Sequence, residues 1–349
     1  MDIFSPEVLD SVTRVMPPQT TFFKKTFFGK DKCEPNTEVR ADFYKGKRRV
    51  APFVSENSKA KTVTKIGYSS EKFETPLVKV KDVTTIEDLV KRLPGELVQN
   101  SGFTPEGRAI QLLAETLQDF NEQISRREEV MCVQALMTGK IPVIGENVNY
   151  TIDFGFTNKS TLSTLWDAQN STADPIKDLS AAVLVCMKNG YRKPNICVME
   201  RSAYDAFIAR CTALGYLNQR NYLDLSIEPS VKNENLTYCG RLRDPNLEIY
   251  LYDEWYIDDW SAATPTEKPM IDKGKVLLAS SNARFSMYYG VLTFTDENTK
   301  SFRSFMATRG TDSWVEKEPA QRFITLNSRP LPVPHEVDSW YVLTVSSTT

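Results

Sequence analysis

The chain of 349 residues is long enough for one large domain or two to three smaller ones. Its 41% hydrophobic, 11% aromatic and 25% charged residues are typical of a folded protein and exclude wholesale disorder. The net charge of −2 argues against a dedicated nucleic-acid binder or a membrane-surface protein, because both need a basic excess.

Residues 1–44 are predicted to form an N-terminal arm, which contains two pairs of phenylalanines: Phe22, Phe23, Phe27 and Phe28. Four such side chains bury a large apolar area only if another part of the protein packs over them. Two interpretations carry equal weight: a local core strand near the terminus, or an arm that lies over another subunit.

Residues 45–92 form a cationic segment, with twelve basic and six acidic side chains, so the rest of the chain carries the opposite excess. The composition predicts strands over 61–68 and 73–80, joined through Ser69-Ser70. Because an isolated hairpin is marginal in water, we expect this ribbon to contact an acidic neighbour, with Lys59, Lys61, Lys65 and Lys72 as candidate contacts. The alternative is a solvated hairpin folded on its own domain.

A long amphipathic helix is predicted over 105–138, because Pro105 fits a helix start and Gly139 fits a helix end. Apolar side chains between them recur at spacings of three, four or seven residues, whereas Glu115 and Glu129 fall on other faces. At 1.5 Å per residue this helix spans roughly 50 Å. A coiled-coil or bundle helix is the ordinary interpretation of such a pattern.

Mixed helix and strand patterns follow Gly139. Helices are predicted from Asp174-Pro175 to Gly190 and from Ser202 to Leu214. Strands are predicted at 141–144, 148–154, 196–199, 247–257, 275–279, 284–294, 322–326 and 341–345.

Few residues suggest catalysis or metal binding. The six cysteines are never closer than eleven residues, which excludes a Cys-x-x-Cys pair and favours free buried thiols over a disulfide framework. His335, the single histidine, follows a proline-rich stretch and is expected to be exposed. Four acids form a cluster that fits either a cation or carboxylate site or, equally well, solvent-facing strand residues: Asp253, Glu254, Asp258 and Asp259. No catalytic, cofactor-binding or metal-binding residue is nominated.

The absence of an ~18-residue apolar run and of a signal-peptide pattern predicts a cytoplasmic protein.

Short motifs along the whole chain carry a family resemblance. In order they are Phe22-Phe23-x-x-x-Phe27-Phe28, 91–96 (KRLPGE), 136–140 (LMTGK), 164–167 (TLWD), 202–204 (SAY), 274–278 (GKVLL), 288–290 (YYG), 319–323 (PAQRF) and 328–332 (SRPLP). Their order and the chain length resemble those of the major capsid proteins of lambda-type tailed bacteriophages, the phage major capsid protein E family.

The resemblance implies an α+β chain with the Hong Kong 97-type capsid fold. Its implied parts are an N-terminal arm (1–44), an extended loop (45–96), a peripheral domain with a spine helix (97–175 and 311–349, with the helix over 105–138) and an axial domain (176–310). It also implies that the chain is not an enzyme, needs no cofactor, and assembles as pentamers and hexamers into an icosahedral head around double-stranded DNA.

The implied partners are further copies of the chain, a scaffolding protein, a portal and, in many relatives, a decoration protein, with packaged DNA bound without sequence specificity and no membrane. The implied location is the virion, after assembly in the host cytoplasm. Covalent cross-linking is not implied. The alternatives are an encapsulin-like shell with an enzyme cargo, a cytosolic α+β enzyme using the acids at 253–259, and, less favoured, a nucleic-acid-binding module.

Overall fold

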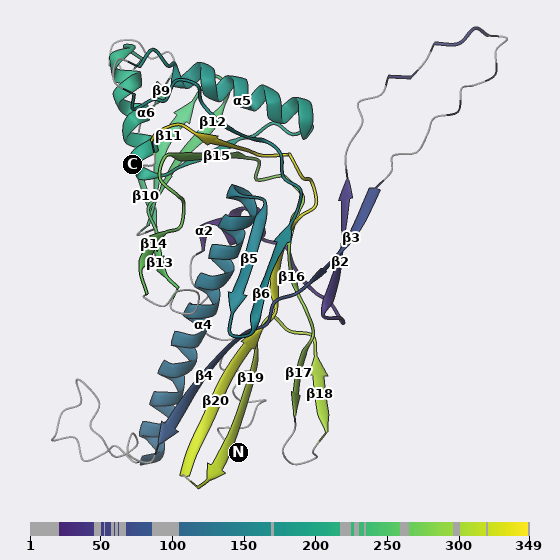
Figure 1. Ribbon diagram of the computed structural model, residues 1–349, viewed down its shortest axis with the longest axis vertical. Helices are drawn as coiled ribbons and strands as arrows, with labels where there is room; N and C mark the ends of the chain where they lie inside the picture. The colour runs from purple at the N-terminus through teal and green to yellow at the C-terminus, as the bar shows by residue number, and fades with distance from the viewer. Residues whose placement is uncertain are drawn as a thin grey trace.

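The computed structural model describes residues 21–44, 50–51, 53–56, 59, 62, 68–85, 105–168, 171–216, 225–226, 230–233, 235–258, 265–295, 301–318 and 320–347. The molecule is elongated, with a sheet and two helices at one end and a long helix running toward the other (Figure 1).

The first end is built on an eight-stranded sheet in the order β10-β11-β12-β8-β15-β22-β7, with β9 paired to β11. These strands are β7 (Lys159–Thr161), β8 (Ile196–Met199), β9 (Leu225–Ser226), β10 (Ser230–Asn233), β11 (Leu236–Leu242), β12 (Leu247–Tyr252), β15 (Lys275–Ala279) and β22 (Tyr341–Thr344). Helices α5 (Pro175–Asn189) and α6 (Arg201–Ala213) share a core with this sheet.

The start and end of α5 confirm the sequence prediction. The Asp174 side chain accepts a hydrogen bond from the Lys177 amide at 3.4 Å, which caps the first turn. Gly190 follows the last turn, where a Cβ atom would lie 2.1 Å from the Asp338 carbonyl oxygen. Only glycine permits this approach of the two backbones.

The second end consists of α4 (Pro105–Met137) packed on a three-stranded sheet of β19 (Gly310–Lys317), β20 (Ala320–Ser328) and β4 (Val78–Thr85). Their core contains the predicted apolar stripe of α4 and two residues of β20: Leu113, Leu117, Phe120, Ile124, Ile324 and Leu326. The helix ends as predicted at Gly139, whose φ is +73° and where a Cβ would lie 2.3 Å from that of Phe156.

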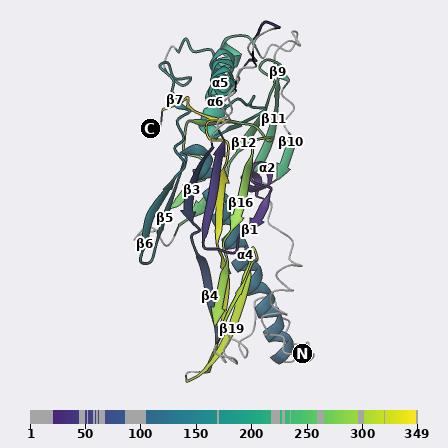
Figure 2. The ribbon, with the colours of Figure 1, turned by 90° about the vertical axis from the view of Figure 1, so that its right-hand side faces the viewer.

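A central layer joins the two ends. It contains β1 (Asp31–Cys33), β16 (Phe285–Tyr289) and β21 (Pro330–Pro334) as one sheet, together with the short helix α2 (Phe22–Phe27). Four two-stranded units extend from the body: β2 (Glu38–Tyr44) with β3 (Tyr68–Glu74), β5 (Lys140–Gly145) with β6 (Val148–Asp153), β13 (Trp255–Ile257) with β14 (Glu267–Pro269), and β17 (Leu292–Thr295) with β18 (Phe302–Phe305). The β2–β3 ribbon lies along one flank (Figures 1 and 2).

The predicted pairing of the cationic ribbon is wrong. Ser69-Ser70 lies inside β3, which pairs with β2 and not with a later strand. The predicted strand over 73–80 is divided between β3 and β4 around Pro76, and β4 pairs with β20. Proline cannot continue a sheet ladder, because it lacks an amide proton. Of residues 61–67, all but Thr62 lie outside the described residues.

The division of the chain into domains stays a prediction, and strand pairing adds a detail to it. Strands β7 and β22, from the two segments expected together (97–175 and 311–349), pair with each other, and β22 also pairs with β15 in the eight-stranded sheet. Strand pairing therefore assigns residues 341–344 and 159–161 to the end that carries α5 and α6.

Candidate functional site

The described residues hold no cluster of potential metal ligands, and their cysteines form no disulfide. Among them, no group of three or more His, Cys, Asp or Glu side chains could hold a metal ion. The six cysteines are free, five of them buried and Cys33 exposed, as predicted for thiols without a disulfide framework. Within the described residues no helix has the length and apolar character needed to cross a membrane.

His335 is half-buried, and the prediction of an exposed loop histidine is wrong. The proline-rich stretch before it forms β21, which pairs with β16. The His335 Nε2 atom lies 3.2 Å from the Tyr288 hydroxyl, and Nδ1 lies 3.2 Å from the Asp42 carbonyl oxygen. Burial lowers the pKa of His335, so the ring serves as a packed, hydrogen-bonded group in the subunit.

The acidic cluster does not converge on one point. Asp253 forms an ion pair with Arg201, and Glu254 accepts a hydrogen bond from the Tyr252 hydroxyl. Asp258 pairs with Arg127 of α4 at 3.0 Å. Asp259 lies outside the described residues. The three described acids have separate structural partners, which favours the interpretation as strand and loop residues over a cation site.

The paired phenylalanines belong to the core of their own subunit. Phe23 and Phe28 are fully buried, and Phe22 and Phe27 nearly so. Phe23 packs edge-on against Tyr252 of β12 at 5.2 Å between ring centroids, and Phe28 stacks on Phe285 of β16 at 5.4 Å. The prediction that these side chains contact a neighbouring subunit is therefore corrected. They form a docked helix, not a strand, because β12, β16 and α4 supply the cover.

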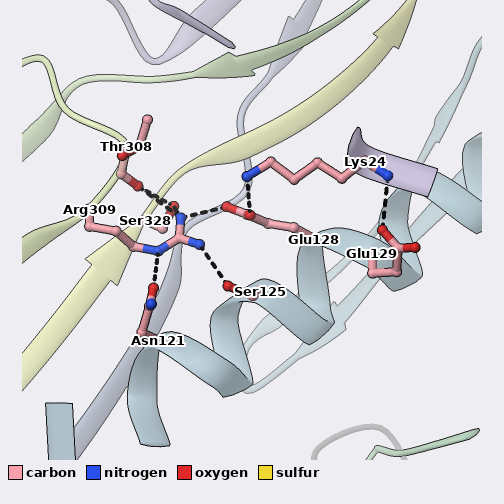
Figure 3. A network of polar contacts seen from close by, with 8 residues as sticks. All are labelled: Lys24, Asn121, Ser125, Glu128, Glu129, Thr308, Arg309 and Ser328. Atoms are coloured by element: carbon pink, nitrogen blue, oxygen red, sulfur yellow. Dashed lines mark hydrogen bonds and ion pairs between the residues drawn. The ribbon is translucent and has the colours of Figure 1, made fainter. Parts of the chain in front are cut away.

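A buried carboxylate of α4 fixes the first turn of this docked helix. The Glu129 side chain accepts a hydrogen bond from the Phe23 amide at 2.6 Å. It accepts a second from the Lys24 amide at 2.9 Å (Figure 3). The Tyr252 hydroxyl oxygen lies 3.3 Å from the same carboxylate. The sequence pattern placed Glu129 away from the apolar stripe, yet it is 1% exposed. Burial raises its pKa to about 7, with the nearby Glu254 acting in the same direction.

Its neighbour Glu128 is the centre of a buried ionic network (Figure 3). The carboxylate is fully buried and pairs with Arg309 Nη1 at 2.5 Å and Lys24 Nζ at 2.9 Å. Arg309 also donates to Ser328 Oγ at 3.1 Å and to the Asn121 side-chain oxygen at 3.3 Å. Burial alone would raise the pKa of Glu128, but Arg309 and Lys24 outweigh it and hold the pKa below its ordinary value. The network joins α2, α4 and β20.

Glu129 gives the subunit a pH-dependent stability. Because its pKa is about 7 in the fold and 4.5 in the reference state, the folded subunit keeps a proton that the unfolded chain releases. The free energy of unfolding should therefore fall by up to about 3 kcal/mol as pH rises from 4.5 to 7 and change no further from this group above 7. Glu129→Gln should lack this contribution.

Urea unfolding of both proteins between pH 5 and pH 8 measures the difference. The exposed Glu146 on the β5–β6 turn supplies the control, since Glu146→Gln should leave the pH profile unchanged. If the free energy of unfolding changed with pH in the same way in the original protein and in Glu129→Gln, the raised pKa of Glu129 would be contradicted.

Two of the four candidate lysines, Lys59 and Lys72, are among the described residues. Lys72 of β3 is exposed and lies 3.5 Å from Glu38 of β2. Lys59 is exposed, while Lys61 and Lys65 lie outside the described residues. The described part of the loop also presents apolar side chains, with Phe53 at 102% exposure beside Val50 and Val54. Val50, Phe53 and Val54 were not among the predicted contacts. The signal for them was in the sequence, because they stand together in segment 48–54 (RRVAPFV) of the cationic loop.

The comparisons with known proteins settle the family. The model of the family Phage major capsid protein E matches residues 5–345.

The chain belongs to this family.

The capsid subunit is 24% identical over 318 residues to the major capsid protein of Escherichia phage lambda, covering 88% of this chain and 89% of that protein. It is 24% identical over 353 residues to the major capsid protein of Enterobacteria phage P21, covering 99% and 100%. Among solved structures, a protein from a prophage of Escherichia coli CFT073, assigned there as a capsid protein, superposes with a TM-score of 0.69 at 17% identity, covering 99% and 100% of the two chains.

These findings confirm the family resemblance and the mixed α+β fold seen in phage capsids. The subunit is a structural protein of a virion capsid and associates with copies of itself, and the alternative of a cytosolic enzyme is wrong. The functional sites of such a protein are its surfaces, and the exposed apolar side chains among the described residues include those of the loop and of the hairpins, such as Phe53, Trp255 and Phe302.

Proposed function

We propose that this subunit forms the icosahedral head of a tailed bacteriophage, assembling as pentamers and hexamers around double-stranded DNA. The observation that carries the proposal is the match of the family model to residues 5–345. The structure adds that Val50 and Phe53 of the loop are exposed in the single subunit. In a symmetric oligomer every exposed patch must find its complement on a copy of the same chain.

The proposed parts follow the Hong Kong 97-type organisation. Helix α4 is the spine helix of a peripheral domain, and the eight-stranded sheet with α5 and α6 is the axial domain. Residues 1–44 form the arm and 45–96 the extended loop. Because β7 and β22 lie in the eight-stranded sheet, residues 159–161 and 341–344 join the axial domain in this proposal.

The extended loop supplies contacts between subunits. Residues 45–61 contain six basic side chains and one acid, Glu56, whereas the whole chain carries a net charge of −2. Opposite charges at an interface steer encounter and fix register, and the apolar Val50, Phe53 and Val54 add burial. Strands β2 and β3 pair only with each other among the described residues, which leaves their outer edges open to backbone pairing with a neighbour.

The other proposed partners are a scaffolding protein, a portal and a decoration protein, and assembly takes place in the host cytoplasm. The net charge of −2 suits a capsid whose inner surface must release its DNA, because binding to DNA strengthens with every phosphate that a basic side chain neutralises.

Negative-stain electron microscopy of the subunit co-expressed with its scaffolding protein tests the proposal. Closed icosahedral particles are expected, and particles that package DNA through a portal distinguish a phage head from an encapsulin-like shell that holds an enzyme. Only unassembled subunits, with scaffold present, would contradict the proposal.

Charge reversal of Lys59, Lys61, Lys65 and Lys72 to glutamate should slow assembly at low ionic strength. The effect should shrink at high salt, because the Debye length falls from about 10 Å at 0.1 M to about 3 Å at 1 M. Light scattering against time measures the rate, and Lys317→Glu on the far end of β19 is an exposed control. If the variant slowed assembly equally at low and high salt, an electrostatic contribution of these lysines would be contradicted.

A further inference from the structure

The hairpin β13–β14 has an outer face on which two large apolar side chains are more than half exposed. Trp255 and Ile257, two residues apart on β13, are 52% and 57% exposed. In the antiparallel register Trp255 lies opposite Pro269, and Ile257 lies opposite Glu267. These four side chains therefore share one face of the ribbon, because side chains alternate along each strand.

The opposite face of this hairpin is tied to the body. Tyr256 packs against the main core. Asp258 forms its ion pair with Arg127 of α4 at 3.0 Å, and Met270, directly after β14, is buried in the same core. These contacts fix the hairpin to the body of the subunit, so its outer face has a defined position.

Two properties of this outer face match the extended loop. Its apolar residues, Trp255 and Ile257, complement the uncovered Val50, Phe53 and Val54 of the loop. Among the described residues of β13 and β14, the one charged side chain on this face is the exposed Glu267, because Lys268 alternates to the opposite face. The loop, in contrast, has six basic side chains between residues 45 and 61. Apolar contact surrounded by opposite charge favours binding with a defined register.

The two surfaces lie on opposite flanks of the subunit. The β2–β3 ribbon that leads to the loop is on the right of Figure 1, and β13–β14 is on the left, beyond α4. In Figure 2, where the right-hand flank faces the viewer, β3 is in front. A donor on one flank and an acceptor on the other make a heterologous contact, which closes into a ring when the rotation between copies is suitable.

We propose that the outer face of β13–β14 binds the loop residues 50–56 of a second copy of this chain. The proposal deepens the proposed function and rests on it, because it names the surface on which each subunit receives the loop of its neighbour. Every copy in a ring would then give one loop and receive one, so the number of these contacts equals the number of subunits.

Site-specific cross-linking of assembled particles tests the inference. The chain carries Cys33→Ser to remove its exposed thiol, together with Phe53→Cys and Trp255→Cys, and a short bis-maleimide joins thiols that lie close together. Denaturing gels should show a ladder of covalent oligomers up to the size of a pentamer or hexamer. A chain that carries only one of the two introduced cysteines should give no ladder. The pair Phe53→Cys and Phe302→Cys is the matched control, because Phe302 is 81% exposed on the separate hairpin β17–β18.

Electron microscopy before cross-linking separates the possible failures. Particles without a ladder from the 53–255 pair, or with an equal ladder from the 53–302 pair, overturn the inference and leave the proposed function standing. Absence of particles from the original protein with its scaffold overturns the proposed function itself. As a second variant, Trp255→Lys with Ile257→Lys should reduce the particle yield at least tenfold without lowering the melting temperature, whereas Phe302→Lys should not. A normal yield from that variant also overturns the inference.

Discussion

Replacing Glu128 with alanine is expected to destabilise the folded subunit by about 3–5 kcal/mol. The substitution removes a fully buried carboxylate and leaves Arg309, whose side chain is 13% exposed, without its ionic partner. The remaining acceptors of hydrogen bonds from the guanidinium are neutral groups such as Ser328 and Asn121, and these cannot compensate a buried charge.

Chemical unfolding of Glu128→Ala measures the loss, and two further variants show its cause. Asp119→Ala removes an exposed acid from the same helix and should change stability far less. Glu128→Met with Arg309→Met removes both charges and should recover much of the stability, because apolar pairs can replace a buried ion pair at little cost. Equal stability of Glu128→Ala and Asp119→Ala would contradict the role of the network.

Replacing Phe23 with alanine is expected to cost about 3–5 kcal/mol of folding free energy, as for other large-to-small changes at buried aromatic positions. Phe23 is fully buried between α4 and the Tyr252 ring, so its removal leaves a cavity that the surrounding elements cannot fill. The effect should appear in the isolated subunit, before any assembly.

Phe53→Ala is the matched control, because that side chain is entirely exposed in the subunit. Thermal unfolding followed by circular dichroism should show a large fall in melting temperature for Phe23→Ala and none for Phe53→Ala. A Phe23→Ala subunit that unfolds like the original protein, yet no longer assembles, would return this residue to an interface role.

Local signals predicted the helices well. The apolar stripe and the glycine at its end predicted α4, and Asp174-Pro175 predicted α5, because capping and amphipathicity depend on residues within a few turns. The pairing of β4 with β20 was missed, because it joins Val78–Thr85 to Ala320–Ser328 and no local pattern specifies a partner so distant in sequence. The same holds for the ribbon, in which β3 pairs backward with β2.

The candidate functional residues show the same difference between local signals and contacts over long sequence distances. The four phenylalanines were singled out correctly as a set that needs cover, but composition could not show that Tyr252 and Phe285 of the same chain provide it. Glu128 and Glu129 looked like ordinary polar residues of a long helix, because Arg309 and the α2 amides that bind them are far away in sequence. The cationic character of the loop, in contrast, is a property of composition and needed no structure.

We propose that the subunit is complete in its core and that its loop needs a second copy to cover it. Sedimentation velocity of a chain with Val50→Asp, Phe53→Asp and Val54→Asp, mixed with scaffolding protein, tests this most directly. We expect a folded subunit with an unchanged melting temperature that sediments as small species only, under conditions in which the original protein forms shells. Shells at the original yield would contradict the account.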